Sequence, residues 1–200
     1  REDWASTLAT RQTLAERCPE RVHIERHPCS MIPLPGSYEA YLASLPQKFR
    51  STLRYRTNKL IKNFKVRMLR TSTQAELAAH LDRLFSLHQA RWRSEGHPGS
   101  FTSAEKRAFY TEVSGDFLKR GWLRFYQLEV DGVIRASQFG FAYGGILHSL
   151  QEGFDHDFHP PGVGGVGVVL RGMAIQECIG EGIQGYDFLG GVEEFKTRWG

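Results

Sequence analysis

The sequence predicts an α/β (α+β) domain built on a mixed sheet. Three observations support this fold class. The apolar period changes from helical to alternating near Gly121, short turns divide residues 122–152 into three strand-like runs, and a glycine-rich turn at 162–167 leads into a helix. A last strand over 184–189 closes the pattern. We therefore expect an antiparallel meander, a crossover helix over 166–180 and a closing strand.

The meander is predicted from its turns. Asp131-Gly132 is a strong two-residue hairpin signal between strands over 122–130 and 133–143. Gly144-Gly145 then turns the chain into a third strand, over 146–152. Strands joined by such short turns must run antiparallel to one another.

The first half of the chain is predicted to be mostly helical. Ser37 is a favourable N-cap, Pro46 suits the first turn of a helix, and Thr73 caps the long helix that follows it. Either Thr102 or Ser103 caps the next helix, which Gly121 ends. In order, the expected elements are a helix over 3–17, a strand around 22–24, a loop over 28–35, helices over 38–45 and 46–63, a strand over 64–69, and helices over 74–93 and 104–120.

Helical spacing predicts which side chains of these helices are buried. The apolar residues recur three or four positions apart and fall on one face of each helix. The residues expected to be buried are Phe49, Leu53, Leu60 and Phe64 on the helix over 46–63. On the helix over 74–93 they are Leu77, Leu81, Leu84 and Leu87 or His88.

Composition limits the class of protein. The hydrophobic content of 40% suffices for a core, and the three cysteines are far apart, which disfavours a disulfide framework or a zinc ribbon and fits a reducing cytoplasm. No apolar run approaches the roughly 18–20 residues that span a bilayer, so we expect a cytoplasmic protein without a membrane span. Because the chain starts at Arg1 and stops at Gly200 beside a charged aromatic cluster, we expect both ends to be cut from a longer protein.

The net charge of +4 is unevenly distributed. Between Ala40 and Ala75 there are nine basic residues and no acidic one, so an anionic partner should meet the protein at this segment. Arg50 and Arg54 lie one helical turn apart and are predicted to clamp an anionic acceptor or a donor phosphate. The alternative for most of these charges is a solvated helix face. Few aromatic residues are interleaved, which disfavours a sequence-specific nucleic-acid module.

The glycine-rich turn is a candidate anion site. Glycines allow successive backbone N–H groups to converge on one anion, and the following helix adds its positive end, so a pyrophosphate is the natural guest. No Gly-Lys-Ser/Thr follows, which excludes a Walker loop, and the preceding hairpins disfavour a dinucleotide fingerprint. The alternative is a flexible loop at a helix start. The predicted donor-binding amides are Val163, Gly164, Gly165, Val166 and Gly167.

Several motifs, in this order and spacing, resemble one family. They are Trp92, Gly99-Ser100-Phe101, Gly121-Trp122-Leu123-Arg124-Phe125, Val130-Asp131-Gly132, Gly153-Phe154-Asp155, Pro161-Gly162, Tyr186-Asp187-Phe188-Leu189-Gly190 and Phe195-Lys196-x-x-Trp199. Over roughly 35–199 the chain resembles the CelD-like acetyltransferases of the GNAT superfamily, which are associated with polysaccharide synthesis and similar to Fem-type peptidoglycan aminoacyltransferases. The resemblance implies the second half of a twin-GNAT protein. Residues 1–35 would be a remnant of the first half or a linker, and 36–200 a GNAT-like domain with truncated C-terminal strands.

The resemblance also implies a donor and a key lysine. The donor would be acyl-CoA, such as acetyl-CoA, or an aminoacyl-tRNA as in the Fem-type relatives. In those relatives the matching Phe-Lys pair carries a lysine that faces the reacting carbonyl, which here is Lys196. Lys196 would stabilise the oxyanion or grip a phosphate, while Phe195 and Trp92 would contact substrate.

Two carboxylates are candidates for proton transfer. Asp187 lies near the end of the last strand, on the face opposite Tyr186, and suits a base or positioning group. A turn-stabilising aspartate is the equal alternative. Glu152 ends the third strand, and strict alternation puts it on the same face as His148 and Leu150, near the donor loop.

A metal site is not expected. His156, Asp157 and His159 fall within four residues, but no distant pair of ligands completes the set. We therefore expect no metal cofactor.

Three hypotheses on function follow. The first is an N- or O-acyltransferase that moves an acyl group from acyl-CoA to an amine or hydroxyl of a sugar, glycan precursor or amino compound in cell-envelope or exopolysaccharide synthesis. The second is a Fem-type transferase that uses charged tRNA. The third is a catalytically silent GNAT-like module that binds an anionic polymer. The acceptor and the oligomeric state stay open.

Overall fold

A computed structural model describes residues 29–94, 96–190 and 194–200, together with Thr13, Glu16 and Arg17. The predicted strand around residues 22–24 lies outside the described residues. Most of the predicted helix over 3–17 lies outside them as well.

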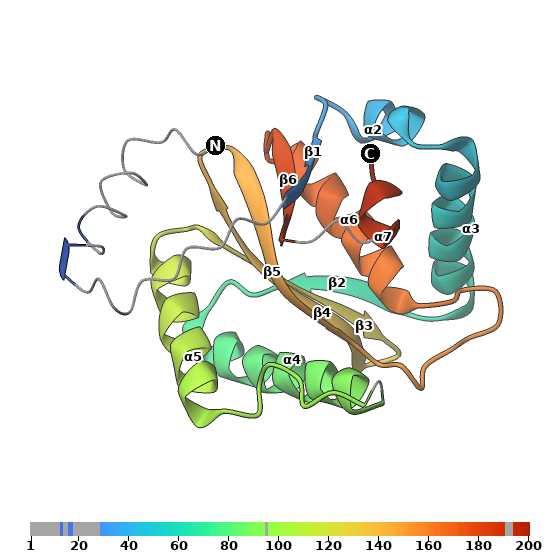
Figure 1. The fold of residues 1–200 in the computed structure, drawn as a ribbon. Helices are drawn as coiled ribbons and strands as arrows, with labels where there is room; N and C mark the ends of the chain where they lie inside the picture. The colour runs from blue at the N-terminus through green and yellow to red at the C-terminus, as the bar shows by residue number, and fades with distance from the viewer. Residues whose placement is uncertain (1–12, 14–15, 18–28, 95, 191–193) are drawn as a thin grey trace.

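Six strands form one mixed sheet in the order β1-β6-β5-β4-β3-β2 (Figure 1). The strands are β1 (Cys29–Pro33), β2 (Val66–Arg70), β3 (Leu123–Val130), β4 (Val133–Tyr143), β5 (Ile146–Phe154) and β6 (Gly185–Gly190). Neighbouring strands are antiparallel except β5 and β6, which are parallel. A parallel pair requires a crossover connection, which α6 supplies. The predicted fold class, with its meander, crossover helix and closing strand, is confirmed.

Helices cover both faces of the sheet. They are α2 (Tyr38–Ser44), α3 (Gln47–Asn63), α4 (Gln74–Ser94), α5 (Ala104–Lys119), α6 (Val166–Gly180) and α7 (Glu194–Thr197). Helices α4 and α5 lie on one face, and α6 lies on the other with α2, α3 and α7 (Figure 1). The site described below lies where α6, α7 and residues 88–92 of α4 approach the sheet.

The helix starts follow the predicted capping chemistry. The Ser37 hydroxyl accepts a hydrogen bond from the Ala40 amide, as expected for an N-cap. At α4, Thr73 and Glu76 form a reciprocal capping box, in which each side chain accepts from a backbone amide of the other end of the turn. Of the two candidates before α5, Ser103 is the cap, and its hydroxyl accepts from Lys106.

The Asp131-Gly132 turn adopts the backbone conformation that its sequence predicts. The φ angles are +50° at Asp131 and +79° at Gly132. Positive φ at both central residues matches the right-handed twist of the flanking strands. Strand β5 continues to Phe154, two residues beyond the predicted end.

Three apolar clusters form the core. One fills the space between the sheet and α4–α5, around Leu81 and Phe125. The other two lie on the α6 face, around Leu60 and Val169 and around Trp199. The predicted buried face of α4 is confirmed, and α3 buries Leu53 and Leu60 while Phe49 and Phe64 are partly buried.

The prediction of a loop over residues 28–35 is wrong in part. Residues 29–33 form β1, which pairs antiparallel with β6, and Ile32 lies opposite Tyr186. Ile32 is the one buried residue of this short strand, so no alternation signals it in the sequence. Proline at its end is tolerated because β1 is an edge strand. The domain boundary at residue 35 stays a prediction.

Candidate active site

Strands β5 and β6 begin side by side and then separate. Their pairing covers three residue pairs, from Ile146 with Gly185 to His148 with Asp187, although both strands run further. The separated ends enclose, with α4, α6 and α7, a cleft of about 530 Å³. The sheet lines it with Ser149, Leu150, Gln151, Glu152, Phe188, Leu189 and Gly190, and the helices with His88, Arg91, Trp92, Arg171, Phe195 and Lys196.

A bulge in β5 decides which face Glu152 occupies. The register between β4 and β5 shifts at Phe139/Gly140, which leaves Leu150 as an extra residue in β5. Glu152 therefore meets Arg171 on α6, whereas His148 stacks on the opposite side, toward α5. The prediction that Glu152 shares a face with His148 and Leu150 is wrong, because an inserted residue reverses the alternation beyond it.

A buried ion pair forms one wall of the cleft. Arg171 Nε donates to Glu152 Oε1 at 3.1 Å, and Arg171 Nη2 donates to Glu152 Oε2. Burial works against the positive charge, but the paired carboxylate raises the pKa of Arg171 above its ordinary value. The guanidinium also lies 5.3–5.5 Å from the ring centroids of Phe188, Phe195 and Trp199. Arg171 thus fixes both Glu152 and the aromatic residues around α7.

Sequence reasoning missed Arg171, although a signal was present. It is the one charged residue between Val166 and Gln176 of an otherwise apolar helix that follows the glycine loop. A charge in such a helix is buried and needs a partner. The bulge that brings Glu152 to it could not be read from the strand pattern.

Lys196 lies in the wall of this cleft. It is 6% exposed, and its amino group donates to the carbonyl oxygen of Gly190 at 2.6 Å. Its neighbour Phe195 is 44% exposed and lines the cleft. Phe195 also lines a second hollow, of about 550 Å³, together with Lys48 and Arg56. The structure therefore brings the predicted pair Phe195-Lys196 together with Glu152.

Asp187 lies outside the cleft lining and supports its edge. Its carboxylate is 6% exposed, accepts from the Leu189 amide at 2.8 Å, and approaches His148 Nδ1 to 3.3 Å. Leu189 lines the cleft and has a φ of +60°, which is uncommon for a side chain of its size. The arrangement favours the turn-stabilising interpretation of Asp187, and its role as a base stays a prediction.

Trp92 lines the opposite side of the cleft and is held by a histidine. Its indole N–H donates to His88 Nε2 at 2.9 Å. Because an indole nitrogen can only donate, His88 Nε2 must be unprotonated. Burial lowers the pKa of His88 below its ordinary value, which also favours the neutral ring. His88 therefore positions Trp92 as a neutral acceptor.

The glycine-rich loop presents amides at the start of α6. Gly162 and Gly164 have φ of +78° and +66°, which side chains rarely adopt. The Val163 amide donates to the Pro160 carbonyl, so it is engaged within the loop. In the described part of the chain, no partner is seen for the amides of residues 164–167, which open α6. These four amides are placed to bind an anion.

The loop packs directly on α3. A β-carbon at Gly164 would lie 3.0 Å from Cζ of Arg56. One at Gly162 would lie 2.9 Å from Oη of Tyr55 and 3.2 Å from Nζ of Lys59. The positive φ angles of Gly162 and Gly164 favour glycine at both positions, and the packing brings the cations of Arg56 and Lys59 close to the anion-binding amides.

The predicted clamp residues Arg50 and Arg54 do not reach the loop. Arg50 Nη1 donates to the carbonyl oxygens of Leu42 and Ala43, at the end of α2. Arg54 is exposed and lies near Tyr38, whose pKa is raised by burial and partly lowered by the Arg54 charge. The helical turn directs Arg56 and Lys59 toward the loop instead. A binding role for Arg50 and Arg54 stays a prediction.

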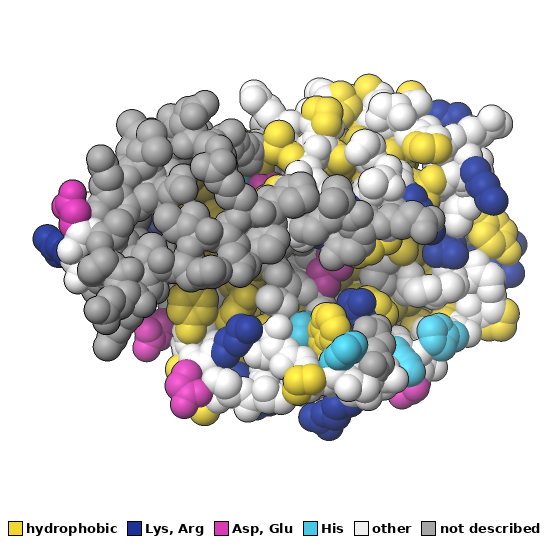
Figure 2. All heavy atoms as spheres, in the orientation of Figure 1, with side chains coloured by type: hydrophobic (Ala, Val, Ile, Leu, Met, Phe, Trp, Pro, Cys, Tyr) yellow, Lys and Arg dark blue, Asp and Glu magenta, His cyan; other side chains and the backbone are white. Residues whose placement is uncertain are grey.

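The outer face of α3 carries a strong positive charge. Figure 2 shows Lys and Arg side chains gathered over α3 at the right of the view, with no Asp or Glu side chain among them. This agrees with the run from Ala40 to Ala75, which contains no acidic residue. An anion that approaches the glycine loop therefore meets a positive potential.

Two further features concern metals and membranes. His156 and His159 have ring centroids 6.0 Å apart, and the described residues contain no group of three or more His, Cys, Asp or Glu side chains arranged to hold a metal ion. None of the helices in the described part of the chain combines the length and apolarity needed to cross a membrane.

Three solved structures share this fold. FemX superimposes with a TM-score of 0.65 at 11% identity, over 87% of this chain and 59% of that one. A conserved protein of unknown function from Bacteroides thetaiotaomicron gives 0.56 at 17%, over 98% and 62%. L-PGS from Bacillus licheniformis gives 0.52 at 12%, over 86% and 56%. The chain thus spans 56–62% of the length of these proteins, and at such identities the similarity shows the fold alone.

The sequence itself identifies the family. No curated protein matches the chain. The family described as "Acetyltransferase (GNAT) domain" matches residues 47–197, which is most of the chain and includes α3, the glycine loop and Lys196. The predicted GNAT resemblance is confirmed at this level, while membership of the CelD-like subfamily stays a prediction. The chain therefore belongs to the GNAT acetyltransferase domain family and carries an acyltransferase domain.

Proposed function

We propose that this domain transfers an acyl group from acyl-CoA to an amine or hydroxyl of a sugar or amino compound used in cell-envelope or exopolysaccharide synthesis. Membership of the GNAT family supports the acyl donor. The cell-envelope context is inferred from the motif resemblance to polysaccharide-associated acetyltransferases.

The separation of β5 and β6 beside α6, the helix that follows the glycine loop, is the observation that carries the proposal. A thioester donor has a long thin arm that ends in a pyrophosphate. The gap between the strands accommodates such an arm, since it is a cleft of about 530 Å³ that starts where pairing ends at His148 and Asp187. The amides of residues 164–167, the start of α6 and Arg56 suit the pyrophosphate.

The chemistry we propose is a direct acyl transfer. The lone pair of the acceptor nitrogen or oxygen attacks the thioester carbon, a tetrahedral oxyanion forms, and the carbon–sulfur bond breaks. The nucleophile gives its proton to the Glu152 carboxylate as the bond forms, and this proton then passes to the departing CoA thiolate, which leaves as CoA thiol. Lys196 is our candidate donor to the oxyanion. Glu152, which two hydrogen bonds from Arg171 hold in place, is our candidate to orient the nucleophile and to relay this proton.

Isothermal titration with acetyl-CoA and CoA tests the proposal. We expect saturable binding of both to the protein, at one site, and release of free CoA when a competent amine or hydroxyl acceptor is added. Acetylated product would be identified by mass spectrometry. Absence of binding for either compound would count strongly against an acyl-CoA donor.

An aminoacyl-tRNA donor is the second candidate, and the basic face of α3 is the observation that favours it. Arg56, Lys59 and Lys62 lie on a helix without acidic residues, beside the loop at which a donor phosphate would bind. A tRNA donor predicts affinity that falls steeply with salt. Charge reversal at Arg50 and Arg54 tests whether these two residues contribute to tRNA binding. Unchanged tRNA binding in that variant would remove those two residues from the interface.

A further inference from the structure

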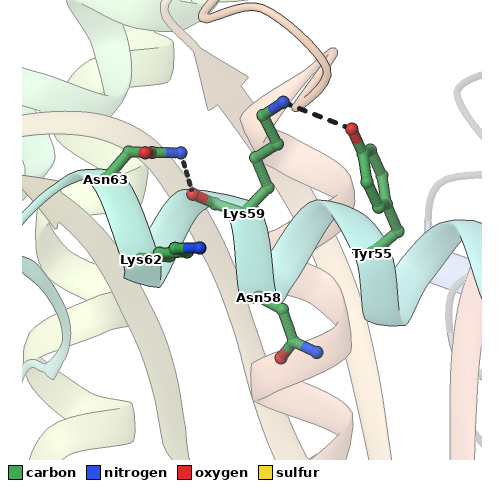
Figure 3. A pocket seen from close by; sticks show the side chains of 5 residues that line it. All are labelled: Tyr55, Asn58, Lys59, Lys62 and Asn63. Atoms are coloured by element: carbon green, nitrogen blue, oxygen red, sulfur yellow. Dashed lines mark hydrogen bonds between the residues drawn. The ribbon is translucent and has the colours of Figure 1, made fainter.

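A shallow hollow lies on α3 beside the glycine loop. It has a volume of about 390 Å³ and is lined by Tyr55, Asn58, Lys59, Lys62 and Asn63 (Figure 3). Its Tyr55–Lys59 end touches the loop, since a β-carbon at Gly162 would contact both side chains. The hollow therefore continues outward from the amides to which we assign the pyrophosphate.

The cations of this hollow are not neutralised by carboxylates. No acidic residue occurs between Ala40 and Ala75, and among the described residues no ion pair is seen for the two lysines of the hollow, Lys59 and Lys62. By contrast Arg67, on the adjacent strand β2, pairs with Glu129 at 2.7 Å. A phosphate group that binds the hollow would thus supply the missing negative charge.

Tyr55 adds an aromatic surface to the same hollow. Its side chain is 54% exposed. The amino group of Lys59 lies 5.6 Å from the ring centroid and donates to the Tyr55 hydroxyl at 3.3 Å, as Figure 3 shows. An exposed ring beside lysines is the combination on which a nucleobase stacks while its phosphate is bound.

We propose that this face of α3 binds the 3′-phosphorylated adenosine end of CoA. The adenine stacks on Tyr55, and Lys59 and Lys62 bind the 3′-phosphate. This subsite rests on the proposed acyl-CoA function, because it starts where the pyrophosphate at the glycine loop would end. It adds a specificity for the 3′-phosphate that the cleft and the loop do not provide.

Titration with CoA and with dephospho-CoA, which lacks the 3′-phosphate, tests the subsite. We expect the wild-type protein to bind CoA about tenfold or more tightly than dephospho-CoA, since one charge-assisted contact has that effect. In K59A/K62A this ratio falls to near one, because the affinity for CoA falls more than the affinity for dephospho-CoA. Y55A lowers the affinities for CoA and dephospho-CoA by a similar factor, and Y55F retains both affinities.

Lys119→Ala is the control. It removes one exposed cation from α5, which lies on the other face of the sheet from α3, and leaves the ratio unchanged. Equal affinity for CoA and dephospho-CoA in the wild-type protein, or an unchanged ratio in K59A/K62A, overturns the subsite while the acyl-CoA function stands. No binding of either compound overturns both. In that event, binding of a short RNA ending in CCA that K59A/K62A abolishes would assign this face to a nucleic-acid donor.

Discussion

The two ends of the candidate donor site use charge in opposite ways. At the glycine loop, Arg56, Lys59 and Lys62 lie on a helix without acidic residues and show no ion pair among the described residues. At the cleft, Arg171 is buried and its charge is matched by Glu152. The first set of cations is available to a ligand, whereas the second is already used to hold protein groups in place.

The exposed cations at the loop attract the ligand, whereas the buried ion pair at the cleft fixes the positions of protein side chains. Solvated cations attract an anionic ligand and lose strength with salt. A buried pair contributes little net attraction to a ligand, but removing one partner leaves an uncompensated charge. Variants at the cleft should therefore affect folding or catalysis, and variants at the loop should affect donor binding.

The largest expected effect is on stability. Arg171→Met leaves the Glu152 carboxylate without its partner and should lower the free energy of unfolding by about 3–5 kcal/mol, measured by urea denaturation. The double variant Arg171→Met/Glu152→Leu removes both charges and should recover most of the loss. A change below about 1 kcal/mol in Arg171→Met would show that the pair does not organise the cleft.

Lys196→Ala should reduce turnover more than any variant at the loop. Loss of one donor to the oxyanion lowers kcat about 100-fold or more, while the dissociation constant of CoA changes little. The rate of CoA release from acetyl-CoA in the presence of acceptor measures this. Lys119→Ala, on an exposed turn of α5, is the control and should retain full activity. Full activity in Lys196→Ala would show that Lys196 is not the donor to the oxyanion, whereas CoA binding without CoA release in the unaltered protein would favour the catalytically silent module.

Gly164→Ala tests the loop. Its φ of +66° and the 3.0 Å approach to Arg56 both disfavour a β-carbon, so we expect a loss of stability of about 1–2 kcal/mol and weaker CoA binding. Gly165→Ala is the matched control, because Gly165 has a φ of −68° and open space around its α-carbon. Equal CoA affinities for the two variants would contradict the anion-binding role of the loop.

The smallest expected effect is a pH dependence of stability that arises at His88. Burial lowers its pKa below the ordinary value of 6.5 in the folded protein. As the pH falls, His88 of the unfolded chain therefore binds a proton before His88 of the folded protein does. The contribution of His88 to the free energy of unfolding is complete above about pH 6.5, and it is lost as the pH falls toward the pKa of the folded state. His88→Gln keeps an acceptor for Trp92 and should flatten this part of the curve, measured by denaturation between pH 7.5 and 5.5. His80, whose pKa burial also lowers, would retain part of the slope.

Local chemistry explains why most of the fold was predictable. Capping at Ser37 and Thr73, the Asp131-Gly132 hairpin and the helical spacing of leucines in α4 all act within a few residues. Such signals do not depend on distant contacts. Strand β1 escaped prediction because its one buried residue, Ile32, is buried by β6, which lies about 150 residues further along the chain.

The candidate site was predictable in part for the same reason. Phe195, Lys196 and Trp92 were predicted from motifs, Glu152 was predicted from its place at the end of a strand, and all four line one cleft. Arg171 was missed because its partner is fixed by a bulge, and a bulge depends on strand pairing. Choosing Arg56 and Lys59 over Arg50 and Arg54 required knowing where the glycine loop packs.

The sequence by itself determined the meander, the glycine turn into α6, the positive charge of α3 and the presence of a lysine after the last strand. Residue type and spacing along the chain are sufficient to determine these properties. Only the tertiary structure decided that β5 and β6 separate after His148, that Glu152 turns toward Arg171 and that Asp187 supports Leu189. Each of these depends on contacts between segments far apart in the chain, whose pairing the local pattern does not specify.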